Sequence, residues 1–357
     1  MAELDARSNK LAVQNAEMGK SQPIRFQFQG SVGNMDEKMS ASSITSTIDL
    51  PEVCFVNVLQ YLDGREITNI SLVSKVWSSV SKSPIVWENG VDMSRFNLDK
   101  KLNMTSLLKL LGRPQFSRLK ALALPYNVKL GKNSVKQLAK SLPQLELFDP
   151  GYYSQNAKCT DSDLLAATEY FTQLNSLRTD MRNVTSSGIG AAVRAMGEQL
   201  VDLRVFGDTI ASHYLSGMTM ETITSCCPNL KYFAYRACST TLYYDPHLDG
   251  VTGECIIRLV DGCRCLETLE LSRAYHVKQS HFVQIAKMVS KKLNEFALRT
   301  MKVIGYSGVN PSGTIDKDCK DPFNIREVLR PFTFLRVEDK FFHSRLENGI
   351  TFLEQVW

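Results

Sequence analysis

The chain has 357 residues, of which 43 % are hydrophobic and 22 % charged, as in ordinary globular proteins. Its net charge of +5 is small for this length, so the sequence predicts neither a nucleic-acid partner nor a membrane surface, which usually need clustered charge. No apolar run reaches the roughly 20 residues of a membrane span, and the first residues lack the pattern of a secretory signal. Nine cysteines without a Cys-x-x-Cys pair indicate a reducing compartment, so we expect a cytoplasmic or nuclear protein.

Residues 1–47 show almost no apolar periodicity and end in a run rich in serine and threonine. Such a segment cannot bury enough surface to offset its ordering entropy. The sequence therefore predicts a disordered N-terminal tail over residues 1–47.

Residues 48–90 carry apolar side chains at helical spacing, which predicts three short helices. In chain order these are Phe55, Val58, Leu59 and Leu62, then Ile67, Ile70 and Val73, and then Val76, Trp77 and Val80. Pro51 marks the start of the first helix, Asp63-Gly64 a turn, and Pro84 the end. So small a module forms a poor core by itself, so we expect it to bind a partner surface.

An apolar-x-x-apolar-x-apolar pattern recurs in the rest of the chain, with helical segments between its copies. The copies begin at Leu119, Leu145, Leu174, Leu200, Leu230, Leu266 and Leu293, with offsets of 26, 29, 26, 30, 36 and 27 residues. This period predicts an α/β solenoid of about seven strand–helix repeats over residues 116–304, with the repeat length of leucine-rich repeats. We expect a linker and an N-terminal cap helix over residues 91–115, and a loop and a C-terminal cap over residues 305–357.

The helical segment also has a specific motif. It reads Leu50-Pro51-Glu52, Val58-Leu59, Tyr61-Leu62-Asp63, Arg65-Glu66, Ser71-Leu72-Val73-Ser74-Lys75, Trp77 and Trp87. In identity and spacing this run resembles the F-box motif, and the region behind it resembles the leucine-rich repeats that follow F-boxes in one subfamily. Gly64, where proline is frequent, departs from the common pattern.

That resemblance implies an all-α F-box followed by a ribonuclease-inhibitor-like solenoid. It implies docking to a Skp-type adaptor that bridges to a cullin–RING ligase. The residues that would contact the adaptor or form the motif core are Leu50, Pro51, Leu59, Leu62, Val73 and Trp77. The chain would then be a non-catalytic substrate receptor of an SCF-type ubiquitin ligase, directing an unknown protein to proteasomal degradation.

The solenoid's concave face is the expected site of target binding. Strand alternation places on it Arg178, Asp180, Asp202, Arg204, Phe206, Tyr232, Arg236, Glu270, Glu295 and Arg299. We expect the target to contact Arg178, Arg204, Phe206, Tyr232, Arg236 and Arg299. Arginines at the same position of consecutive repeats suggest an anionic target signal such as a phosphopeptide, unless Asp180 and Asp202 pair with them.

Other functions remain open at this point. Cys226, Cys227, Cys263 and Cys265 could suggest a metal site, but Cys227 and Cys263 fall at a core position of the repeat, so we expect no metal and no cofactor. The sequence contains no known catalytic motif. The alternatives are a leucine-rich-repeat scaffold that is not coupled to ubiquitination, and an enzyme whose site lies among the loops.

Overall fold

The computed structural model describes ten stretches of the chain. They are residues 11–13, 26–28, 51–94, 103–125, 128–151, 159–207, 215–236, 251–272, 277–305 and 329–341. The chain divides into two compact units, one made of residues 1–92 and 113–119 and the other of residues 93–112 and 120–357. The segment expected to be a linker and cap helix, 91–115, therefore contributes to both units.

Two short strands lie within the segment that we expected to be disordered. β1 (Leu11–Val13) and β2 (Phe26–Phe28) pair antiparallel, with Leu11 opposite Phe28. Each has apolar residues two positions apart, which is the alternation of a strand. The expectation of a wholly unstructured tail is therefore wrong at these two strands, and the rest of residues 1–50 lies outside the described residues.

The first unit contains the three expected helices and short elements after them. They are α1 (Glu52–Leu59), α2 (Gly64–Ser71), α3 (Lys75–Val80), the 3-10 turn η1 (Pro84–Trp87), β3 (Val91–Asp92) and the 3-10 turn η2 (Pro114–Phe116). We call α1, α2, α3 and η1 the helical module. Asp63 caps α2 by accepting hydrogen bonds from the N–H groups of Arg65 and Glu66, and the Glu66 carboxylate accepts from the N–H of Asp63.

The core of the helical module is small but closed. Its buried apolar side chains include Phe55, Leu59, Ile67, Val80 and Val86. The Trp77 ring meets the Phe55 ring edge-on, with centroids 4.9 Å apart. The Trp87 indole N–H donates to the carbonyl of Ser81 at 2.6 Å, so this buried polar group has a partner.

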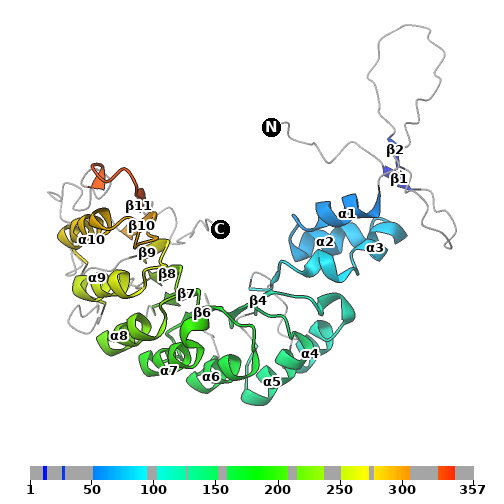
Figure 1. The fold of residues 1–357 in the computed structure, drawn as a ribbon. Coiled ribbons are helices and arrows are strands. Elements are labelled where there is room, and N and C mark those ends of the chain that lie inside the picture. Colours follow the sequence, from blue (N-terminus) through cyan, green and yellow to red (C-terminus); the bar gives the residue numbers. More distant parts are fainter. Residues whose placement is uncertain are drawn as a thin grey trace, which may run out of the picture. The chain divides into compact units, whose positions relative to one another are not determined.

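The second unit alternates helices with strands. Its elements are α4 (Met104–Leu111), β4 (Ala121–Ala123), α5 (Lys132–Ser141), β5 (Leu147–Asp149), α6 (Asp161–Tyr170), β6 (Ser176–Asp180), α7 (Ser186–Met196), η3 (Gly197–Gln199), β7 (Asp202–Phe206), α8 (Gly217–Cys226), β8 (Tyr232–Arg236), α9 (Gly253–Gly262), β9 (Thr268–Ser272), α10 (Gln279–Lys291), β10 (Thr300–Gly305) and β11 (Arg336–Phe341). The strands β4 to β11 pair in parallel and in sequence order, and α5 to α10 lie side by side along one face of this sheet (Figure 1). We call the other face of the sheet the open face.

Every second strand residue points toward the helices and is buried there. Leu177, Leu203, Phe233, Leu269 and Met301 stand in register across β6 to β10 and are at most 1 % exposed. The helices contribute Leu164, Ile189, Ile223, Ile256 and Ile285, all fully buried. The strand phase expected for β6 to β9 is thus confirmed.

Shared carbonyl groups mark the start of each repeat. The carbonyl of Asn175, for example, accepts hydrogen bonds from the N–H groups of Val201 (2.7 Å) and Asp202 (3.2 Å) in the next repeat. The carbonyls that accept two consecutive N–H groups in this way belong to Lys120, Glu146, Asn175, Val201, Lys231 and Glu267. We call this series the carbonyl ladder, and its intervals of 26, 29, 26, 30 and 36 residues are those of the sequence pattern.

The last expected repeat is misplaced by five residues. β10 pairs Thr300 with Thr268, so the counterpart of Leu266 is Leu298 rather than Leu293, and the interval is 32 residues. Leu293 is 42 % exposed, whereas Leu298 is fully buried. There are two causes: α10 has 13 residues where α8 and α9 have ten, and eight residues (292–299) separate α10 from β10 where five separate α8 from β8 and α9 from β9.

The segment expected to be a loop and C-terminal cap contains a further strand. β11 pairs with β10 in parallel, with Arg336 opposite Thr300. Within the described residues the run from β4 to β11 therefore has eight strands, one more than the seven expected. Apart from 305 and 329–341, residues 305–357 lie outside the described part of the chain.

Neighbouring helices are joined at their first turns. The Asp161 carboxylate of α6 accepts hydrogen bonds from the N–H (2.7 Å) and the hydroxyl (2.6 Å) of Thr185, the residue that caps α7. Gly188 lies against this carboxylate, and a Cβ at position 188 would stand 2.2 Å from the Asp161 Cγ. A side chain there would displace a carboxylate that is held by two hydrogen bonds.

Candidate functional site

The helical module keeps several large apolar side chains on its surface. The five most exposed are Val53, Val58, Tyr61, Leu72 and Val73, with exposures between 51 % and 91 %. We call these five residues the exposed apolar set. So many large apolar side chains exposed on so small a module indicate a surface that binds another protein.

Helix geometry explains how one short helix contributes to both core and surface. Phe55 and Leu59 are four residues apart and face the module core. At 100° per residue, Val53 points away from that face and Val58 lies at its edge, while Tyr61 lies in the turn after α1. Leu72 and Val73 lie in the turn between α2 and α3.

The residues expected to bind the adaptor divide between this surface and the core. Pro51 and Val73 are exposed, and Leu62 and Trp77 are half-buried. Leu59 is fully buried, so its side chain is part of the module core and not of its surface. Leu50 lies outside the described residues.

Sequence reasoning quoted Val58, Tyr61 and Leu72 in the motif but did not select them as contact residues. Val58 is exposed because the module core occupies another face of α1. Tyr61 lies in the turn after α1, and Leu72 lies in the short turn between α2 and α3. Helical periodicity carries a signal for Val58 alone, because it is an apolar residue of α1 outside the face that Phe55 and Leu59 bury.

The open face carries three rows of side chains across β6 to β10. The row at the strand starts is Ser176, Asp202, Tyr232, Thr268 and Thr300; the middle row is Arg178, Arg204, Ala234, Glu270 and Lys302; and the row at the strand ends includes Asp180, Phe206, Arg236 and Ser272. Strand pairing therefore aligns Arg178 with Arg204, as expected, and it also aligns Phe206 with Arg236. Lys302 was missed because the last repeat was placed five residues early.

Two arginine–aromatic pairs form the centre of this face. The Arg204 guanidinium lies over the Tyr232 ring, with its Cζ 4.2 Å from the centroid. The Arg236 guanidinium lies 5.4 Å from the centroid of Phe206. Together with Glu270, these four residues form what we call the open-face cluster.

Both arginines of the cluster form ion pairs with carboxylates of the chain. Arg204 donates from Nε to Asp202 Oδ1 at 3.0 Å and from Nη2 to Asp202 Oδ2 at 2.8 Å. Arg236 donates to Glu270 Oε1 from Nε at 2.9 Å and from Nη2 at 2.6 Å, and the Tyr232 hydroxyl donates to Glu270 Oε2. The anion expected beside Arg204 is therefore Asp202, so the structure favours paired charges over an open phosphate site there.

The titration of these groups reflects the pairing. Burial raises the pKa of Glu270, but the charge of Arg236 and the hydrogen bonds from Tyr232 and Arg236 lower it by more, so the pKa lies below its ordinary value. Burial lowers the pKa of Arg204, and the hydrogen bonds and charge of Asp202 raise it by more. Both groups are thus held in their charged forms at neutral pH.

Glu295 and Arg299 do not belong to the open face. Arg299 occupies the carbonyl-ladder position, equivalent to Glu267, and donates from Nη1 to the carbonyls of Phe296 and Leu298. Glu295 lies before the strand and pairs with Arg264 at 3.0 Å. Their expected place on the concave face is wrong because it used the misplaced last repeat.

The cysteine pair at the repeat core has the character expected of packing residues. Cys227 and Cys263 are fully buried. Burial raises the pKa of each thiol to about 12, which keeps both protonated at neutral pH. Within the described stretches, no group of three or more His, Cys, Asp or Glu side chains is placed to hold a metal ion.

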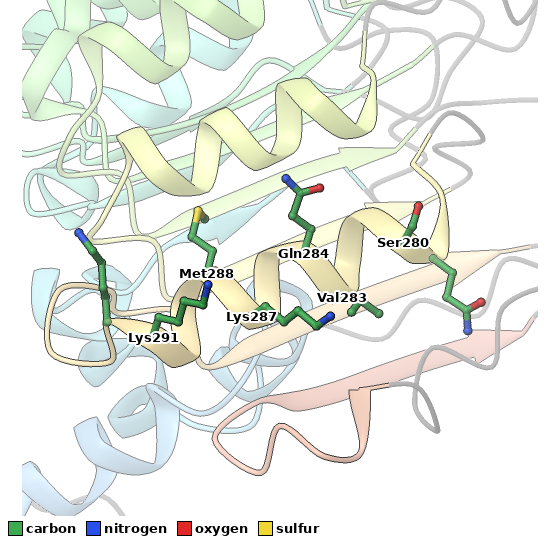
Figure 2. Close-up of a pocket in the computed structure, with 8 residues that line it drawn as sticks. Ser280, Val283, Gln284, Lys287, Met288 and Lys291 are labelled. Carbon is green, nitrogen blue, oxygen red and sulfur yellow. The ribbon is translucent and has the colours of Figure 1, made fainter.

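A shallow hollow of about 770 Å³ lies along α10. Figure 2 shows Val283, Lys287, Met288 and Lys291 on the helix face that lines it. All of its lining residues come from α10 and the residue after it, so no second element supplies converging groups. We assign it no ligand.

None of the helices in the described stretches is both long and apolar enough to cross a membrane.

A comparison with known proteins finds a family match for part of the first unit. Residues 48–89 match the family model of the F-box domain. Among solved structures, the chain is similar to one titled "Crystal structure of Rad7 and Elc1 complex in yeast", with 16 % identity and a TM-score of 0.38, over 78 % of this chain and 70 % of that chain. A likeness of that degree carries no argument. No curated protein matches the chain.

Proposed function

We propose that this chain, which carries an F-box domain at residues 48–89, is the non-catalytic substrate receptor of an SCF-type cullin–RING ubiquitin ligase. The F-box docks a Skp-type adaptor, and the second unit, a leucine-rich-repeat solenoid, binds the protein to be ubiquitinated and degraded. The observation that carries the proposal is the coincidence of the F-box match with the exposed apolar set.

The exposed apolar set supports the docking step. A helical module with its own closed core does not need Tyr61 or Leu72 for packing, because both are exposed. Burial of such side chains against a partner contributes about 25 cal/mol per Å² of apolar surface. Because the exposed apolar set lies within the F-box match, we assign it to adaptor binding.

The open-face cluster supports the capture of a protein target. Arginine, tyrosine and tryptophan are enriched among the residues that contribute most to binding in protein interfaces, and lysine and glutamate are depleted from interfaces. Arg204, Tyr232 and Arg236 are also fixed by their mutual contacts, so ordering them on binding costs little entropy. An interface built on a rigid cluster is suited to selecting one partner.

The docking step can be tested with two single variants of the full chain. Tyr61→Asp and Leu72→Asp each place a carboxylate in the surface that the adaptor would cover, and an unpaired buried charge costs several kcal/mol. We expect at least about 100-fold weaker adaptor binding in calorimetry or co-elution, since each 1.4 kcal/mol is tenfold. Circular dichroism should be unchanged, because both positions are exposed.

Asn69→Asp is the matched control, since it adds the same charge at an exposed polar position of α2. It should bind the adaptor normally. If Tyr61→Asp and Leu72→Asp also bind normally, the proposed docking surface is wrong. Leu59→Asp is not a useful docking variant, because it places a charge in the module core and should unfold the module.

A further inference from the structure

A long stretch of the chain carries positive charge and no negative charge. Between residues 100 and 145 there is no aspartate or glutamate, although the chain has 37 acidic residues. The basic residues of the stretch are Lys100, Lys101, Lys109, Arg113, Arg118, Lys120, Lys129, Lys132, Lys136 and Lys140. The small net charge of the whole chain conceals this block, because acidic residues elsewhere compensate it.

Within the second unit, α5 collects part of the block on one face. Lys132, Lys136 and Lys140 are four residues apart, so they lie within an arc of about 80°. Of the buried residues of α5, Leu138 faces away from this arc and Val135 lies to one side of it, and all three lysines are exposed. We call Lys132, Lys136 and Lys140 the lysine ridge.

The neighbouring helix extends the positive surface. Lys109 of α4 is exposed, and it lies about 180° around the helix from the buried Leu107 and Leu111. Helices α4 and α5 pack against each other. Lys129, which precedes α5, is exposed as well.

Three basic residues of the block have a carboxylate partner: Arg118 pairs with Glu88, Lys120 with Glu146 and Lys132 with Glu169 of α6, the last at 3.2 Å. In the described part of the chain no ion pair involves Lys109, Lys129, Lys136 or Lys140, although the Lys136 Nζ lies 5.5 Å from the centroid of the Tyr170 ring. Two of the three ridge ammonium groups, Lys136 and Lys140, are therefore without an ion pair in the described residues, and Lys132 shares its charge with Glu169.

The surroundings of the ridge suit a nucleic-acid backbone better than a protein. Protein interfaces have an apolar core and are depleted in lysine. None of the large exposed hydrophobic residues of the described chain falls between residues 100 and 145. The ridge lysines are about 6 Å apart along the axis of α5. A DNA strand carries one phosphate charge per about 3.4 Å of its own helix axis, so each lysine can reach a separate phosphate.

We propose that the lysine ridge of α5, extended by Lys109 and Lys129, binds the phosphodiester backbone of nucleic acid without reading its sequence. Phosphate contacts of this kind position a protein on a strand and leave the bases unread. The proposed receptor would thereby capture targets located on DNA or RNA. Binding of nucleic acid does not depend on the adaptor, so it can fail or succeed independently of the ligase function.

The test uses the full chain and fluorescently labelled mixed-sequence oligonucleotides of about 20 nucleotides, single- and double-stranded, in anisotropy titrations at roughly 50 to 200 mM salt. We expect a Kd on the order of 10⁻⁶ to 10⁻⁴ M near physiological salt, weakening as salt rises. The triple variant Lys132→Ala, Lys136→Ala, Lys140→Ala should bind at least about tenfold more weakly, with a salt slope smaller by about 2 to 3. Alanine is a strong helix former, so α5 should remain folded.

The control removes three lysines from another helical surface, with Lys287→Ala, Lys291→Ala and Lys292→Ala around the α10 hollow (Figure 2). It changes the net charge equally and should leave nucleic-acid binding within about twofold. No oligonucleotide binding, or equal losses in both triple variants, would overturn the proposal. So would a ridge-dependent affinity for polyglutamate or for phosphatidylserine vesicles that equals or exceeds that for oligonucleotides.

Discussion

Glu270 is the most connected charged residue of the open-face cluster. Its carboxylate is only 5 % exposed and joins β9 to β8 through Arg236 and Tyr232. A buried carboxylate is tolerated when charged and hydrogen-bonding partners replace its water. In Glu270, Arg236 and Tyr232 together lower the pKa of the carboxyl group by more than burial raises it.

The lowered pKa makes a prediction about acid stability. A carboxyl group whose pKa is lower in the folded state stabilises the fold above its unfolded pKa of about 4.3, and this contribution is lost as the pH falls through the folded pKa. Glu270→Gln should therefore lower the free energy of unfolding at pH 7 by roughly 1–3 kcal/mol. The difference from the natural chain should narrow progressively below about pH 4.

Urea unfolding of both proteins at several pH values measures this difference. Glu267→Gln is the matched control, because the ion pair of Glu267 with Lys231 is exposed at both ends and should contribute less than about 1 kcal/mol. A Glu270→Gln deficit that stays constant from neutral to strongly acid pH would show that charge plays no part.

At the scale of single elements, the first turns of the helices determine how repeats stack. Thr185 both caps α7 and donates to Asp161 of α6, so one residue fixes a helix start and a helix–helix contact. Gly188 provides the space for that contact. Helix propensity alone would favour alanine at this position.

Two glycine variants of α7 separate propensity from packing. Gly190→Ala should stabilise the second unit by about 0.5–1 kcal/mol, because its Cβ would meet Thr219 at an ordinary 3.4 Å. Gly188→Ala should destabilise it instead, because its Cβ would overlap the Asp161 carboxylate. Thermal melting of the two variants decides the matter, and a stabilised Gly188→Ala protein would refute the proposed constraint.

The elements themselves were largely predictable from the sequence, and their side-chain partners were not. Six of the seven expected repeats follow the pattern of leucines, because a buried strand next to a buried helix leaves a strong periodic signal. The seventh failed because Leu293, Phe296 and Leu298 satisfy the pattern by chance, while strand pairing selects Leu298 and Met301. On the open face, strand alternation correctly placed Arg204 and Tyr232. It could not show that Asp202 pairs with the Arg204 guanidinium, because that contact depends on the side-chain rotamers of both residues.

The helical module shows the same limit in another form. Spacing identified Leu59 as an important residue, but spacing cannot tell a contact residue from a core residue when both are apolar. Tyr61 and Leu72 became visible as surface residues only once the core was known. The charge block between residues 100 and 145 was present in the sequence, but a whole-chain charge balance conceals it.

At the scale of the whole molecule, the proposed receptor function requires two surfaces in two separately compact units. The exposed apolar set lies in one unit and the open-face cluster in the other. Variants at sites that share no partner usually have additive effects. Docking and target capture should therefore be separable.

Variants in the two surfaces should therefore separate adaptor docking from target capture. Tyr61→Asp should abolish adaptor binding but retain the protein target, whereas Tyr232→Ala with Arg236→Ala should lose the target by at least about tenfold and retain the adaptor. Quantitative mass spectrometry of captured proteins with the cullin inactivated measures both. If a partner that is captured through the open face shows unchanged turnover when the cullin is active, the chain is a scaffold and not a ligase receptor.

The carbonyl ladder has a consequence for how such a chain diversifies. It anchors each repeat at the point where the strand begins, and it tolerates intervals from 26 to 36 residues without a change of register. Length can therefore accumulate after a strand ends, as between Arg236 and Val251, while the next strand still meets its neighbour. Segments inserted after a strand, whether by evolution or by protein engineering, would therefore add new binding surface without changing the register of the sheet.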